Sequence, residues 1–110
     1  MRLLIVDDDL HLLENMVVHF NEDHIVKHTT YPKQAMELLS KEKFDYLITD
    51  YQMPLVNGME LAKYALSLYD IAVIMVTGDT ELVSDDPRIV IRYKPVSYAA
   101  IHGMVKERKS

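Results

Sequence analysis

Residues 3–9 read Leu-Leu-Ile-Val-Asp-Asp-Asp, a short apolar run that stops at three consecutive aspartates. Similar apolar runs return at residues 46–49, 71–76 and 89–91. Between them lie longer segments whose apolar residues recur at helical spacing. Because strands that alternate with helices are typical of parallel sheets with crossover helices, the sequence predicts an α/β fold.

Local signals place the first three helices. Asp9 is the expected N-cap of the first, Pro32 suits the first turn of the second, and Asn57 with Glu60 predicts a capping box for the third. A weaker strand at residues 24–29 precedes the second helix. The residues expected to face inward are Leu13, Met16, Val17 and Phe20, then Ala35, Leu38 and Leu39, then Met59, Ala62, Ala65 and Leu66.

The C-terminal third departs from this regular alternation. The fourth strand is expected to end at Thr77, and Asp85, Asp86 and Pro87 then favour turns over a helix. Any fourth helix within residues 79–88 should therefore span only about one or two turns. A fifth strand at residues 89–93 leads to a last helix that begins near Ser97. Its final cations suit the negative end of the helix dipole, and they are Lys106, Arg108 and Lys109.

The composition limits the class of protein. A length of 110 residues with 49% hydrophobic content suits one core, so residues 1–110 are expected to form one domain without a separate output module. The absence of cysteine excludes disulfides and thiolate metal sites and fits the reducing cytoplasm. No apolar run is long enough to span a bilayer. A net charge of −5 disfavours direct binding to nucleic acid or to an anionic membrane.

Polar residues follow four of the predicted strands. Asp7 and Asp8 end the first strand, Asp50 the third and Thr77 the fourth, and Lys94 follows the fifth. The carboxyl ends of parallel strands meet at one edge of the sheet, where ligands bind in open α/β folds. We therefore expect these five residues to lie close together in space.

Three neighbouring carboxylates repel one another, and a cation would relieve that repulsion. Mg²⁺, or Mn²⁺ in its place, fits best, because hard cations prefer oxygen ligands and neither cysteine nor a strand-end histidine is present for zinc. The ion would bridge Asp50 to an incoming phosphoryl group, while Lys94 and the Thr77 hydroxyl would bind other oxygens of that group. Asp50 needs no general base, because an ionised carboxylate is already nucleophilic.

Each of these residues also has a purely structural interpretation. An aspartate after a strand commonly caps a helix or forms a turn, a Thr-Gly step often begins a loop, and a lysine before proline is usually a solvated surface residue. The complete set favours function, because a domain without this chemistry has no reason to end its strands with these residue types in this order.

Four stretches of the chain resemble the receiver domain of two-component response regulators, and the resemblance covers the whole length. The stretches are residues 3–9, Asp50-Tyr-Gln-Met-Pro-Leu-Val-Asn-Gly58, the Val-Thr77-Gly78 step and Lys94-Pro95. The resemblance implies a flavodoxin-like (βα)5 three-layer sandwich with a five-stranded parallel sheet. It also implies phosphoryl transfer to Asp50 from a phosphohistidine on a partner histidine kinase or phosphotransfer protein.

The same resemblance implies a role for each matching residue. The metal ligands are Asp7, Asp8, Asp50 and the backbone carbonyl of Gln52, the switch hydroxyl is Thr77, and the phosphate clamp is Lys94. The Lys94–Pro95 peptide bond is expected to be cis. The resemblance further implies that slow hydrolysis removes the phosphoryl group, so the domain is expected to assist its own phosphorylation and dephosphorylation without being an enzyme. Phosphorylation is then expected to switch binding to a downstream protein or output domain.

Two features depart from the family pattern. Ile91 stands three positions before the lysine, where an aromatic switch residue is usual, whereas Tyr93 lies immediately before Lys94. The segment between Thr77 and Lys94 is also about one helical turn shorter than usual. Family members use this region for partner binding and for phosphorylation-linked dimerisation. A phosphorylation-linked dimer is therefore one alternative for this chain. We expect the acidic residues 79–88 to form the moving part.

Other functions compete with this interpretation. A degenerate receiver would act as a phosphate-independent protein-interaction module, which only the atypical switch favours. A nucleotide-binding or phosphohydrolase enzyme would need a glycine-rich turn after the first strand or a second acid or base, and neither is evident. The histidines show no metal-ligand spacing and no carboxylate partner, so no metal or relay role is assigned to His24 or His28. His11 and His19 are expected on the solvated side of the first helix.

Overall fold

The computed structural model describes residues 1–107, with the side chains of residues 1–105. They form one parallel sheet in the order β2-β1-β3-β4-β5. The strands are β1 (Arg2–Val6), β2 (Ile25–Thr29), β3 (Tyr46–Asp50), β4 (Ala72–Thr77) and β5 (Ile89–Tyr93). The helices are α1 (Leu10–Phe20), α2 (Pro32–Lys41), α3 (Gly58–Leu68) and α4 (Tyr98–Glu107). The predicted three-layer α/β fold is confirmed.

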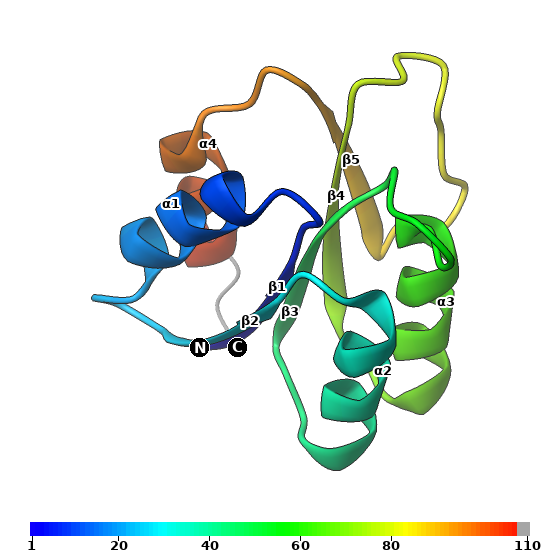
Figure 1. Cartoon of the computed structure of the whole chain (residues 1–110), viewed down its shortest axis with the longest axis horizontal. Helices are drawn as coiled ribbons and strands as arrows, with labels where there is room; N and C mark the ends of the chain where they lie inside the picture. The colour runs from blue at the N-terminus through cyan, green and yellow to red at the C-terminus, as the bar shows by residue number, and fades with distance from the viewer. Residues whose placement is uncertain (108–110) are drawn as a thin grey trace.

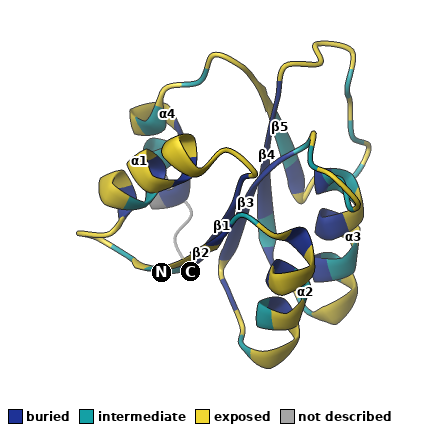
Figure 2. Ribbon diagram, viewed as in Figure 1, coloured by how far each residue is buried: buried dark blue, intermediate teal, exposed yellow. Residues whose placement is uncertain are grey.

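Helices cover both faces of the sheet, with α1 and α4 on one side and α2 and α3 on the other (Figure 1). Successive side chains of a strand point to opposite faces, so the central strands supply two cores. Leu4 and Leu47 enter the core under α2 and α3. Leu3 and Ile48 enter the core under α1 and α4. Burial is concentrated in the central strands and the inward helix faces (Figure 2). The residues at the ends of these strands therefore extend from a buried, well-packed sheet.

The predicted helix starts are confirmed. Asp9 Oδ1 accepts hydrogen bonds from the backbone N–H groups of His11 and Leu12, at 3.0 and 3.3 Å, and satisfies the free amides at the beginning of α1. Asn57 and Glu60 form both halves of the capping box before α3. Pro32 lies at the beginning of α2, where a missing N–H is tolerated.

The inward faces follow the prediction in α1 and in α2, where Leu38 is only partly buried, and they shift in α3. In α1, Leu13, Met16 and Phe20 are buried, and Val17 is partly buried. In α3 the buried face runs through Gly58, Leu61, Ala62 and Ala65, whereas Met59 and Leu66 are only partly buried. Gly58, the first residue of this face, lies against the backbone of Asp50 and Tyr51.

The segment between β4 and β5 contains no α-helix in the described structure. Residues 79–88 instead form successive turns, in which Glu81 N donates to Asp79 Oδ1 at 3.0 Å and Arg88 N donates to Asp86 Oδ1 at 2.9 Å. The short or irregular element expected there is therefore an irregular loop. Side chain–backbone bonds of this kind offer the chain an alternative to helical hydrogen bonds.

The last helix begins as predicted, one residue after Ser97, whose Oγ accepts from Ala100 N at 3.3 Å. Of the cations predicted for its end, Arg108 and Lys109 lie outside the described residues, as does the side chain of Lys106. Among the described residues, no helix is long and apolar enough to cross a membrane.

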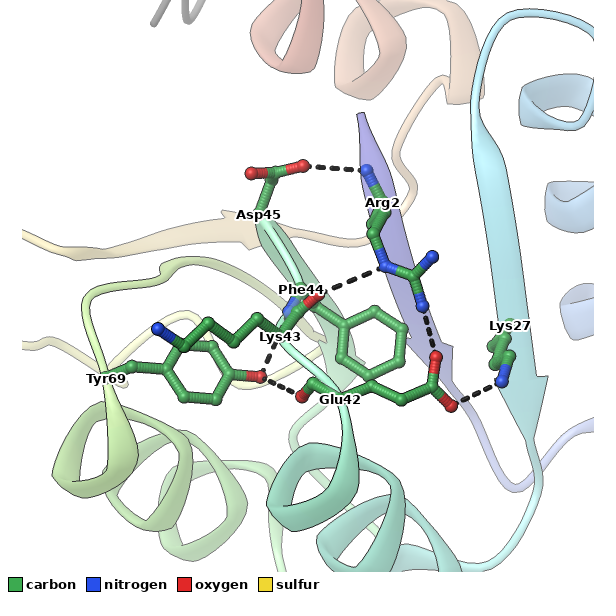
Figure 3. Close-up of polar contacts among 7 residues, drawn as sticks. All are labelled: Arg2, Lys27, Glu42, Lys43, Phe44, Asp45 and Tyr69. Carbon is green, nitrogen blue, oxygen red and sulfur yellow. Dashed lines mark hydrogen bonds and ion pairs between the residues drawn. The ribbon is translucent and has the colours of Figure 1, made fainter.

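A polar network joins β1 to the segment before β3 at the opposite end of the strands from the aspartates (Figure 3). Arg2 and Lys27 both form ion pairs with the carboxylate of Glu42. Tyr69 Oη donates to the backbone carbonyl of Glu42 at 2.9 Å and accepts from Phe44 N at 3.1 Å. These contacts tie the α2–β3 connection to β1 and to the end of α3, and so support the register that aligns the far ends of β1 and β3.

Candidate phosphoacceptor site

Three carboxylates converge at the carboxyl edge of the sheet. One oxygen from each of Asp7, Asp8 and Asp50 lies within 4.8 Å of the others. Asp7 and Asp50 are only 6% and 5% exposed, whereas Asp8 is exposed. The convergence follows from topology, because β1 and β3 are adjacent parallel strands that end at the same edge. In the described part of the chain, no other three His, Asp or Glu side chains meet so closely.

Burial of these acids changes their titration. Burial raises the pKa of Asp7 from 3.8 to about 6, although the Asp9 amide, which donates to Asp7 Oδ1 at 2.9 Å, acts in the opposite direction. Burial also raises the pKa of Asp50, while the charge of Lys94 lowers it. The site therefore concentrates more negative charge than its surroundings stabilise, which favours binding of a cation.

Lys94 is the cation that the chain itself supplies. Its Nζ lies 3.3 Å from Asp50 Oδ1. That oxygen is buried and accepts no hydrogen bond from the described residues. One ammonium group does not balance the charge of three converging carboxylates, and an all-oxygen donor set suits Mg²⁺. The residues present thus fit a divalent metal beside Asp50.

Thr77 is fully buried at the end of β4. Its Oγ1 accepts a hydrogen bond from Asp79 N at 2.9 Å, which leaves the hydroxyl proton available to donate elsewhere. Its backbone carbonyl accepts from Lys94 N at 2.7 Å, so β4 and β5 align these two residues. The Lys94–Pro95 peptide bond is cis, as the resemblance implied.

The remaining predicted site residues are Gln52, Ile91 and Tyr93. Gln52 lies exposed in the loop after β3, and the role of its carbonyl as a metal ligand stays a prediction. Ile91 is partly buried and packs against the core beneath α3. Tyr93 is 40% exposed, and its Oη donates to the backbone carbonyl of Leu82 at 2.8 Å. Tyr93 thus joins β5 to the irregular β4–β5 loop.

Gly58 supports the site, yet the sequence analysis assigned it no role. A Cβ at this position would lie 2.3 Å from the backbone oxygen of Asp50 and 2.8 Å from Tyr51 Cα. Gly58 N donates to the Tyr51 carbonyl at 2.8 Å. The missing side chain lets α3 begin directly against the strand that carries Asp50. A glycine in the first turn of a predicted helix was the available signal, because alanine is the better helix former.

Comparison with known proteins identifies the family. Residues 3–91 match the model of the response regulator receiver domain. This chain belongs to that family. The receiver domain is 34% identical over 89 residues to the heme response regulator HssR of Staphylococcus aureus strain JH9, an alignment that covers 80% of this chain. The aligned part of this chain spans only 39% of that relative's length.

Solved receiver domains share the fold. A CheY-like receiver domain protein from Methanospirillum hungatei JF-1 superposes with a TM-score of 0.85 at 26% identity. The superposition covers 96% of this chain and 90% of the solved chain. A receiver domain protein from Clostridium thermocellum superposes with a TM-score of 0.87 at 20% identity, with coverage of 96% and 91%. Receiver domains act in two-component signalling as phosphoacceptors rather than as conventional enzymes, and they generally bind Mg²⁺ at an acidic pocket.

Proposed function

We propose that the receiver domain, formed by residues 1–110, accepts a phosphoryl group on Asp50 from a phosphohistidine of a partner histidine kinase or phosphotransfer protein. A carboxylate oxygen of Asp50 attacks phosphorus, a P–O bond forms, the P–N bond to the donor imidazole breaks, and the imidazole leaves with the electron pair. The observation that carries this proposal is the convergence of Asp7, Asp8 and Lys94 on the buried Asp50 carboxylate.

Asp7, Asp8, Asp50 and the backbone carbonyl of Gln52 would hold Mg²⁺ or Mn²⁺. When bound, the ion offsets the charge on the phosphoryl oxygens and helps align them for in-line transfer. Lys94 would bind one phosphoryl oxygen through Nζ, from its present position 3.3 Å from Asp50. The Thr77 hydroxyl would donate to another, because its oxygen already accepts from Asp79 N and its proton is left to donate.

Signalling then depends on the lifetime and the consequences of the acyl phosphate. Water attacks the phosphorus slowly and restores the Asp50 carboxylate, so the domain assists its own dephosphorylation without acting as a turnover enzyme. Phosphorylation alters binding of a downstream protein or output domain. We place this cycle in the cytoplasm, where response regulators typically act.

Intact mass spectrometry after incubation with Mg²⁺ and a small-molecule phosphodonor tests the acceptor chemistry. One added phosphoryl group is expected in the wild type and in Asp70→Asn, a matched control at an exposed aspartate outside the site. No adduct is expected in Asp50→Asn or when a chelator removes the metal. An equal adduct in Asp50→Asn would overturn Asp50 as the acceptor.

A phosphate-independent interaction module is the second candidate. It is favoured by Ile91, which is partly buried against the core at the position where the family usually has an aromatic switch residue. A folded wild-type protein that gives no adduct with any phosphodonor would support this candidate. An adduct at Asp50 accompanied by changed partner binding would exclude it.

A further inference from the structure

Helices α1 and α4 lie on the same side of the sheet (Figure 1). Three histidine rings meet between these two helices and the turn before β2. His102 of α4 neighbours His19 of α1 and His24 of the turn before β2, with a ring-centroid distance of 5.3 Å in each pair. Asp23 Oδ2 lies 3.2 Å from His102 Nε2. The sequence analysis found no carboxylate partner for the histidines, because Asp23 and His102 are far apart along the chain and meet only in the folded protein.

This cluster is separate from the acceptor site. The eleven residues of α1 begin beside the aspartates and end next to the histidines, so the two groups lie roughly one helix length, about 15 Å, apart. The His102 side chain is only 15% exposed and packs with its ring centroid 5.0 Å from that of Phe20. Asp23 is 47% exposed, so the group opens to solvent on one side. His11 and His28 lie outside the cluster and are exposed.

The distances match those between ligands of one tetrahedral metal ion. With bonds of about 2.0–2.1 Å, two ligand atoms on Zn²⁺ lie roughly 3.3 Å apart, and two imidazole centroids lie roughly 5 Å apart. The corresponding values here are 3.2 Å between Asp23 and His102, and 5.3 Å between His24 and His102. In the described conformation these side chains do not bring three ligand atoms within 4.8 Å of one another, so the His24 ring must rotate to complete the set.

We propose that Asp23, His24 and His102 form a second metal site, which takes a borderline transition-metal ion such as Zn²⁺. Asp23 contributes Oδ2 and His102 contributes Nε2, while the partly buried His24 ring supplies the third ligand. Water occupies the remaining position, as in other zinc sites with three protein ligands. Two imidazoles and one carboxylate suit zinc better than Mg²⁺, which prefers oxygen ligands alone.

Occupation of this site would join α4 to the turn that follows α1. Asp23 and His24 follow α1, whereas His102 lies in α4, far along the chain. The bound ion would therefore cross-link the turn after α1 to α4. Because the unfolded chain lacks this arrangement, binding should stabilise the folded protein. The rotation required of His24 makes the site weaker than a fully preformed one.

Titration of the whole chain with Zn²⁺ by isothermal calorimetry, in excess Mg²⁺ to occupy the aspartate cluster, tests the proposal. One Zn²⁺ per chain is expected. His102→Phe, which keeps a ring against Phe20, and Asp23→Asn should each weaken binding by at least about tenfold, since even residues that only orient a metal ligand are worth about 10- to 100-fold. His24→Ala should weaken it similarly, whereas His19→Ala, His11→Ala and His28→Ala should bind as the wild type.

Nitrogen NMR of the imidazole rings in the unsubstituted protein provides a test that does not depend on the folding of variants. Zn²⁺ should shift the ring nitrogens of His24 and His102 and leave those of His11 and His28 unchanged. Wild-type affinity in a folded His102→Phe protein, absence of binding to the wild type, or loss of binding in Asp50→Asn would each overturn the proposed site. Loss in His19→Ala, but not in His24→Ala, would overturn His24 as the third ligand.

Discussion

Leu55 holds an unfavourable backbone conformation in the loop that follows Asp50. Its φ is 72°, and its side chain is 88% exposed, so packing does not compensate for the strain. A side chain in the left-handed region costs about 1–2 kcal/mol, whereas glycine adopts it readily. Glycine also makes the unfolded chain more flexible, so Leu55→Gly should raise the free energy of unfolding by about 1 kcal/mol or less.

Urea unfolding measures this difference, and Leu55→Ala is the matched control. Alanine removes the exposed side chain but keeps the Cβ that causes the strain, so it should leave stability nearly unchanged. Equal stabilisation by alanine and glycine would show that the exposed side chain, rather than the backbone, is responsible.

Asp7 makes stability depend on pH in the absence of metal. Its pKa is raised from 3.8 to about 6, so between these values the folded protein holds a proton that the unfolded chain has lost. The contribution of Asp7 to the free energy of unfolding should therefore fall as pH rises from about 4 to about 6. This fall should be about 1–2 kcal/mol after allowance for solvent screening.

Urea unfolding at several pH values in a chelator measures this dependence. Asp7→Asn should reduce the slope, and the raised pKa of Asp50 should leave a smaller slope of the same sign. Excess Mg²⁺ should oppose the decrease, because the metal binds the deprotonated carboxylates. The same pH dependence in Asp7→Asn and in the wild type without metal would contradict the burial of Asp7 as a neutral acid.

At the scale of elements, the junction between β3 and α3 has no room for a side chain. A Cβ on Gly58 would lie 2.3 Å from the Asp50 backbone oxygen, whereas a Cβ on Gly103 in α4 would meet no atom within 4 Å. Gly58→Ala should therefore destabilise the protein by about 1–3 kcal/mol or more, because α3 must move away from β3. Gly103→Ala should stabilise it by about 0.5–1 kcal/mol, because alanine favours the helix.

Thermal or urea unfolding of the two variants measures this contrast. Gly58→Ala should also lower the yield of phosphorylated protein at equal folded fraction, because the displaced backbone carries Asp50. Wild-type stability in Gly58→Ala would mean that α3 does not begin against the acceptor strand.

At the scale of the whole molecule, the β4–β5 loop connects the acceptor site to the edge of the sheet. Asp79 N donates to Thr77 Oγ1 at one end of the loop, and Tyr93 Oη donates to the Leu82 carbonyl further along. If phosphorylation displaces the Thr77 side chain, Oγ1 moves and the hydrogen bond from Asp79 N weakens. Hydrogen exchange of residues 79–88 should therefore change when a phosphate analogue and Mg²⁺ bind, since a switch requires different contacts in its two states.

Amides of β1 and β3 serve as the internal reference, because the central strands are buried and should keep slow exchange. Tyr93→Phe should speed exchange near Leu82 even without the analogue. Identical exchange of residues 79–88 with and without the analogue, at demonstrated binding, would exclude this loop as the moving part.

The sequence by itself determined the order of the strands and helices along the chain and the places where the first three helices begin. It also determined the edge of the sheet at which the aspartates meet. Apolar runs, helical spacing and caps such as Asp9 act between residues a few positions apart, so they can be recognised without coordinates. The convergence of Asp7, Asp8 and Asp50 was predictable as well, because a parallel sheet brings its carboxyl ends to one edge.

Only the tertiary structure decided which contacts form between segments far apart in the chain. It placed Gly58 against the backbone of Asp50 and brought Asp23 to His102. The raised pKa of Asp7 likewise arises mainly from burial, which depends on the packing of the whole fold. These features rest on distances set by the simultaneous packing of several elements, and residues close together in the sequence do not specify such distances.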